Sequence, residues 1–186
     1  MMAAMMLSIT IPWMMAVWRL TPQSPTRSVV EFLAGYLLTW TVFSVAASMM
    51  QGLLSNATLI STTGVPNTPL FGGVLLFVAG LFQLTKIKER CLAHCQSPLG
   101  FFLTTWHGGR WGIIRMGIHH GTYCVGCCWA LMLLGFVAGV MNLIWMIGVT
   151  IYVFVDQSLL KTPALSRLTG AFLLIWGAWT IVESEL

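Results

Sequence analysis

All the cysteines and histidines of this 186-residue chain lie in one stretch, between residues 91 and 128. Thiolates and imidazoles are the usual ligands of soft and borderline metal ions such as Cu(I) and Zn(II). Their concentration in one part of the chain therefore indicates a metal site. The residues concerned are Cys91, His94, Cys95, His107, His119, His120, Cys124, Cys127 and Cys128.

The denser group opens an apolar stretch, residues 112–134, that has the length of a helix. Cys124 follows His120 by four residues, and Cys127 and Cys128 follow it by three and four, so a helix places these side chains on one face. An imidazole with two or more thiols suits Cu(I) or Zn(II), and nearby thioethers favour Cu(I). Alternatively, the cysteines are only small packing residues and the histidine is simply hydrogen-bonded. The cost of polar groups inside a bilayer favours a functional role.

A second group, Cys91, His94 and Cys95, follows a short basic segment. If this segment is helical, Cys91 and Cys95 share a face, and the helix ends at Ser97 because Pro98 follows it. Residues 99–106 are too few to span a bilayer and indicate an interfacial or re-entrant piece. We therefore expect the two Cys/His groups to meet at the cytoplasmic boundary of the membrane. The alternative is a pair of reduced, inert thiols.

Methionine supplies a third signal, with twelve in the chain. Thioethers are soft, neutral donors, so a row of them could pass Cu(I) outward from the Cys/His end. Filling gaps between packed helices is the other common role of methionine. The methionines at the expected outer ends of the helices are Met1, Met2, Met5, Met6, Met49, Met50, Met132, Met141 and Met146.

The composition of the chain indicates an integral membrane protein. Apolar residues make up 58% and charged residues only 8%, against about 25% charged residues in a soluble domain. This excludes a disordered chain, a collagen-like or coiled-coil protein and a small disulfide-stapled module. The net charge of +4 does not indicate nucleic acid, because topology signals account for the basic residues. We expect one membrane metal-binding domain over residues 1–186, with its Cys/His core at residues 91–128.

Apolar stretches of the length that a bilayer requires, about 20 residues, predict an all-α fold. We expect a polytopic helix bundle with about six transmembrane helices. The expected spans are residues 1–18, 29–54, 69–84, 112–134, 139–155 and 168–182.

The basic residues all fall after the first, third and fifth of these spans. By the positive-inside rule these connections are cytoplasmic, so we expect both termini outside and the Cys/His cluster toward the cytoplasmic side of a bacterial inner membrane. Asp156, at the inner end of the fifth span, is a polar group that the bundle must satisfy unless it faces cytoplasmic water. The basic residues are Arg19, Arg27, Lys86, Lys88, Arg90, Arg110, Arg115, Lys161 and Arg167.

Two segments carry a resemblance to a known family: HGTYCVGCCW at residues 120–129 and CLAHCQSPL at residues 91–99. With further similar segments over most of the chain, it resembles the metal-binding integral membrane proteins described as copper chaperones for tyrosinase-type enzymes. Ser8, Lys86 and the pair Asp156 and Gln157 depart from the family pattern. His119 lies outside the motif. The ligands that the resemblance implies are His120, Cys124, Cys127 and Cys128, a second set of Cys91, His94 and Cys95, and the thioether of Met141.

We therefore expect a membrane copper chaperone or insertion factor, not an enzyme, that holds Cu(I) in preference to zinc. Its partners would be the lipid bilayer and a copper-dependent client, either a tyrosinase-type oxidase or a membrane copper monooxygenase that it accompanies as an accessory subunit. One alternative is a thiol-disulfide oxidoreductase using Cys124 and Cys127, although the charge pattern places these thiols near the reducing cytoplasm. The others are a purely structural accessory subunit and a haem protein with His119 or His120 as ligand.

Overall fold

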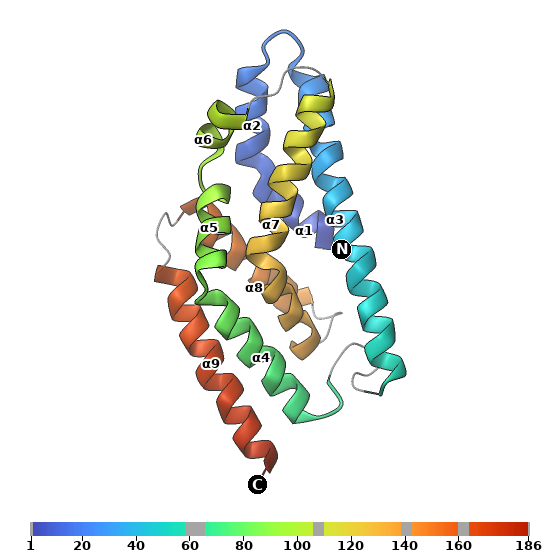
Figure 1. The fold of residues 1–186 in the computed structure, drawn as a ribbon, viewed down its shortest axis with the longest axis vertical. Coiled ribbons are helices and arrows are strands. Elements are labelled where there is room, and N and C mark those ends of the chain that lie inside the picture. The colour runs from blue at the N-terminus through green and yellow to red at the C-terminus, as the bar shows by residue number, and fades with distance from the viewer. Residues whose placement is uncertain (1, 59–65, 106–109, 139–142, 160–163, 186) are drawn as a thin grey trace.

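The computed structural model describes residues 2–58, 66–105, 110–138, 143–159 and 164–185, and these residues form helices joined by short turns (Figure 1). The described residues contain no β-strand, which confirms the all-α prediction. The elements are α1 Met2–Leu7, the 3₁₀ helix η1 Ser8–Thr10, α2 Ile11–Leu20, α3 Pro25–Asn56, α4 Pro69–Gln83, α5 Lys86–Cys95, α6 Pro98–Thr105, α7 Arg110–Ala138, α8 Leu143–Phe154, the π-helical turn η2 Val155–Leu159 and α9 Ala164–Glu185.

Each of the six expected apolar stretches coincides with a helix, or with the consecutive elements α1, η1 and α2, within four residues at either end. By length and composition, however, only α3 and α9 among the described residues can cross a membrane. A third span results if α4 and α5, which meet at an angle of 66°, count as one bent helix. Helices α4 and α8 have 15 and 12 residues, fewer than the roughly 20 that a bilayer requires. The six-span count therefore stays a prediction.

Helix α7 packs directly against the backbone of α3. A side chain at Gly35 of α3 would collide with the carbonyl oxygen of Ile114, and one at Gly117 of α7 would collide with that of Phe32. Small residues of this kind let two helices approach closely where lipid supplies no hydrophobic driving force between them. This contact fixes the position of α7, which carries four of the eight candidate ligands, relative to α3.

A second close pair, α4 and α9, lies side by side in the lower half of Figure 1, where the chain ends. An added Cβ at Gly80 would lie 2.9 Å from the carbonyl oxygen of Gly170, and one at Gly177 would lie 2.9 Å from that of Gly73. The four glycines occur in two pairs with a seven-residue spacing, which returns each pair to the same helix face. This pairing holds the lower half of the bundle together, and α4 also packs against α7.

The contact between α3 and α7 leads to a first prediction. Substitution Gly117→Ala should lower the free energy of unfolding by about 1–3 kcal/mol, because its methyl group overpacks the contact with α3. The loss should appear in a titration of the detergent-purified protein with dodecyl sulfate, followed by tryptophan fluorescence.

Gly135→Ala is the matched control, since Gly135 lies in the same helix and an added Cβ there meets no atom within 4 Å. Its expected effect is neutral, or stabilising by up to about 1 kcal/mol through helix propensity. Equal stability of the two variants would contradict the close packing of α3 and α7.

Candidate functional site

Three cysteine thiols are buried at the middle of α7. The side chains of Cys124, Cys127 and Cys128 are each at most 1% exposed. The thiols of Cys127 and Cys128 both donate to the carbonyl oxygen of Cys124, over 3.1 and 2.8 Å. Both sulfurs therefore turn back toward the preceding turn of the helix, as long side chains in α-helices do. The three thiols are gathered within about one turn.

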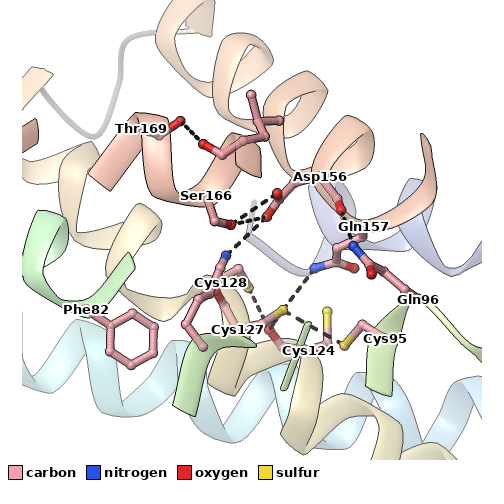
Figure 2. A network of polar contacts seen from close by, with 12 residues as sticks. Phe82, Cys95, Gln96, Cys124, Cys127, Cys128, Asp156, Gln157, Ser166 and Thr169 are labelled. Carbon is pink, nitrogen blue, oxygen red and sulfur yellow. Dashed lines mark hydrogen bonds and ion pairs between the residues drawn. The ribbon is translucent and has the colours of Figure 1, made fainter. Parts of the chain in front are cut away.

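Helix α5 brings a fourth buried thiol to this group. The Thr85 hydroxyl caps the start of α5 by accepting from the backbone N–H of Lys88 over 3.3 Å, and the helix ends at Cys95, ahead of Pro98. The Cys95 and Cys127 sulfurs lie 3.9 Å apart (Figure 2). The prediction that the two cysteine groups meet is confirmed by this contact.

The distance between these sulfurs suits a bridging metal ion. With metal–sulfur bonds of about 2.3 Å, two sulfurs on one ion are about 3.8 Å apart in tetrahedral geometry and about 4.6 Å apart in linear geometry. The observed 3.9 Å falls within this range. Within the described parts of the chain, no three or more His, Cys, Asp or Glu side chains converge as a metal ion of higher coordination would need. Cys95 and Cys127 are thus the pair of candidate ligands whose spacing fits a shared metal ion.

Two polar side chains approach Cys127 from other helices. The amide Nε2 of Gln157 donates to the Cys127 sulfur over 3.0 Å, as Figure 2 shows. The ammonium of Lys88 donates to the Cys127 carbonyl oxygen over 2.8 Å. A sulfur that accepts an amide hydrogen bond is better placed to be a thiolate, because donors to the charged form stabilise it. Sequence reasoning missed both residues as parts of the site.

The Lys88 ammonium also forms a buried ion pair. Its nitrogen lies 3.3 Å from an Asp156 carboxylate oxygen, and the two side chains are 2% and 1% exposed. The Ser166 hydroxyl lies 3.1 and 3.0 Å from the two oxygens of that carboxylate, and Gln96 donates to the Asp156 carbonyl oxygen over 2.8 Å. This network joins α5, η2 and α9 beside the thiols.

The ion pair differs in two respects from what the sequence suggests. Asp156 does not face water but is paired inside the bundle, and Lys88, counted there only as one of the basic residues of the cytoplasmic side, is buried. The π-helical turn η2 explains the first difference, since its wider winding allows the consecutive residues Asp156 and Gln157 both to point inward. The Lys88 ammonium and the Asp156 carboxylate can both be buried because each neutralises the charge of the other.

The His120 imidazole lies in an aromatic cluster. It is 2% exposed and stacks on Trp13, with ring centroids 3.7 Å apart, and its Nδ1 atom has no hydrogen-bond partner. Its ring also stacks on that of Tyr36 at 5.5 Å, and the Tyr36 hydroxyl lies 3.6 Å from the Cys124 sulfur. His120 and Cys124 thus share the face of α7 that packs on α3, while Cys127 contacts α5.

The remaining predicted ligands lie around this centre. Cys91 is half-buried, and its sulfur would lie 3.3 Å from a Cβ added at Gly126 of α7. The His94 ring stacks on Tyr123 of α7 with centroids 3.9 Å apart. Met141 lies outside the described residues.

The described methionines do not all share one environment. Met6, Met132 and Met146 are buried, whereas Met49 and Met50 on α3 are exposed. The proposed outward row of thioethers therefore stays a prediction.

A protein-family model described as PpoB2, a copper chaperone, matches residues 1–180 of the chain. No curated protein and no solved structure matches it. The matched range includes both cysteine groups, the aromatic cluster around His120 and the buried ion pair.

The buried ion pair leads to a second prediction. Lys88→Met should lower the free energy of unfolding by about 3–5 kcal/mol, because it leaves the Asp156 carboxylate buried without a counter-charge. Adding Asp156→Asn to this variant should recover part of the loss, since no charge then remains buried. The same titration with dodecyl sulfate measures both effects.

Arg167→Met is the matched control. Arg167 pairs with Glu89 over 2.7 Å, but their side chains are 61% and 31% exposed. Exposed pairs contribute about 0–1 kcal/mol, so this variant should remain close to the wild type. If Lys88→Met is no less stable than Arg167→Met, the network does not stabilise the fold.

Proposed function

The chain belongs to the PpoB2 copper chaperone family, and from this premise we propose that it is an integral membrane protein that holds Cu(I) on buried thiolates and delivers it to a copper-dependent enzyme. The observation that carries the proposal is the 3.9 Å separation of the Cys95 and Cys127 sulfurs, which come from different helices. Thiolate sulfur is a soft ligand, and soft ligands select Cu(I). The ion would join α5 to α7.

Copper is favoured over zinc by the small number of converging donors. Protein zinc sites have three or four protein ligands in a tetrahedral arrangement. Among the described residues no three or more His, Cys, Asp or Glu side chains are arranged to hold a metal ion, whereas the Cys95 and Cys127 sulfurs lie 3.9 Å apart, and Cu(I), a monovalent ion, accepts two or three soft donors. We assign Cys95 and Cys127 as the primary ligands, with Cys124 and Cys128 as neighbouring thiols to which the ion can shift.

The other ligands implied by the sequence form an outer set in this proposal. Cys91 and His94 lie on α5 beside the thiols, His120 lies in the aromatic cluster next to Tyr36, and Met141 would supply a thioether. Release of copper then requires only ligand exchange, in which donors of the client replace the thiolates one at a time. The protein makes and breaks no covalent bond in the client, so we propose no enzymatic activity. A tyrosinase-type oxidase or a membrane copper monooxygenase fits as client.

The copper site leads to a third prediction. Protein purified in mild detergent under anaerobic, reducing conditions should contain about one copper ion per chain, and Cys127→Ser and Cys95→Ser should each lose most of it, because a hydroxyl is not a soft ligand. Elemental analysis of copper, zinc and iron measures the outcome. Cys91→Ser, the matched control, should retain its copper.

Full copper content in both Cys95→Ser and Cys127→Ser would overturn the proposed ligand pair. A metal-free wild-type protein with a disulfide between these cysteines in gently isolated membranes would instead support the thiol oxidoreductase alternative. The Cys95 and Cys127 sulfurs lie 3.9 Å apart, so the same geometry is also compatible with the thiol oxidoreductase function.

For the membrane arrangement we propose a single domain of about six spans in a bacterial inner membrane, with both termini outside. The positions of the connection between α2 and α3 and of the C-terminus support this orientation. In Figure 1 the connection between α2 and α3 lies at one end of the molecule, and the end of α3, the start of α4 and the C-terminus lie at the opposite end. The basic residues Arg19 and Arg27 flank the first of these connections. That end would face the cytoplasm.

The orientation leads to a fourth prediction. Alkaline phosphatase fused after Leu186 should be active, because this enzyme needs the oxidising periplasm to form its disulfides. The same reporter inserted between Pro22 and Gln23, in the connection between α2 and α3, should be inactive. The opposite pattern would invert the topology.

A further inference from the structure

Two histidines approach each other at the surface where α5 meets α7. His94 of α5 and His119 of α7 have ring centroids 5.7 Å apart, with their planes at 85°. Tyr123 contacts both rings, at 3.9 Å from His94 and 5.0 Å from His119. Phe101 of α6 packs on both as well, at 4.9 and 5.5 Å. The aromatic neighbours hold two imidazoles close together, one from each helix.

The pair leads from the surface toward the thiols. His119 is exposed and His94 is half-buried. His94 is followed directly by Cys95, whose sulfur contacts that of Cys127. The Nε2 atom of His94 is buried and has no hydrogen-bond partner. An unpaired buried nitrogen is costly, and a residue that served only to stack could be phenylalanine. This nitrogen is therefore a donor available for a ligand.

The separation of the rings suits a shared metal ion. With metal–nitrogen bonds of about 2.0–2.1 Å, two imidazoles on one ion have centroids about 5–6.5 Å apart, depending on the angle at the ion. The observed 5.7 Å lies within this range. Imidazole is a weaker ligand for Cu(I) than thiolate, so an ion held here would pass readily to the deeper sulfurs.

We propose that His94 and His119 form an entrance site that takes up Cu(I) and passes it to Cys95 and Cys127. This inference rests on the proposed function, and it adds His119, which the family motif does not include. No electron is transferred in this step. The ion exchanges imidazole nitrogens for thiolate sulfurs, and the protons released from the thiols pass to solvent.

The test measures the rate of copper loading and the final copper content separately. The full-length protein in detergent is mixed anaerobically with the coloured Cu(I)–bicinchoninate complex, and loss of its absorbance gives the rate. His119→Phe and His94→Phe keep an aromatic ring in the cluster but remove the metal donor. Each should slow loading by about tenfold or more, because the ion is no longer concentrated at the mouth of the site. The final copper per chain should be unchanged in His119→Phe.

Thr122→Ala is the matched control, because Thr122 is exposed on the same helix and its hydroxyl only donates to the backbone carbonyl of Ile118. It should load at the wild-type rate. A second measurement does not depend on loading rate. Carbethoxylation of His119, located by mass spectrometry, should be slowed by Cu(I) added beyond the capacity of the thiols, and this protection should disappear in His94→Phe.

The outcomes separate this inference from the proposed function. A wild-type protein that takes up no copper would refute the proposed function itself. A wild-type protein that takes up copper, with His119→Phe and His94→Phe loading equally fast, would overturn the entrance site alone. A lower final copper content in His119→Phe would also overturn it, because His119 would then belong to the storage site.

Discussion

The burial of one lysine ammonium shapes the centre of this protein. Removing the Lys88 charge from water is costly unless an opposite charge and further hydrogen-bond partners surround it. Asp156 supplies the charge and the Cys127 carbonyl oxygen a hydrogen bond, while Ser166 contacts the carboxylate in turn. These partners belong to three elements other than α5, which carries Lys88, so satisfying one cation fixes α5, α7, η2 and α9 around the same point. The thiols lie at that point.

The positions of the helices could be predicted from the sequence because apolar length is a local property. The meeting of Cys95 with Cys127 was also predictable, since both cysteine groups were expected at the same membrane boundary. The partners of Lys88, Asp156 and His120 were not, because they depend on which side chains other helices present. The inward orientation of the Asp156 side chain depends on the short π-helix η2, which the hydrophobic periodicity of the sequence does not predict.

The candidate metal ligands lie at different depths in the protein, which we call layers. The thiols of α7 and Cys95 are buried between helices, His120 lies within stacked aromatic rings, and His119 is exposed at the surface of the protein. Such a gradient from imidazole to thiolate runs from weaker to stronger affinity for a soft ion. The glycine contact between α3 and α7 holds the donors of α7 in register, since a displacement of α7 would move His119, His120 and its three cysteines together. If the proposed roles hold, copper would be stored and admitted at different depths between α5 and α7.

The length of α3 has a consequence for where its charged end lies relative to the bilayer. Its 32 residues extend about 48 Å, whereas the hydrocarbon core of a bilayer is about 30 Å thick. As a membrane span, α3 must therefore extend beyond the hydrocarbon core into the headgroup region even when it is tilted. At the end that begins at Pro25, Arg27 is paired to Glu31 in the first turns. As a span, α3 would thus place this ion pair at the depth of the charged lipid headgroups.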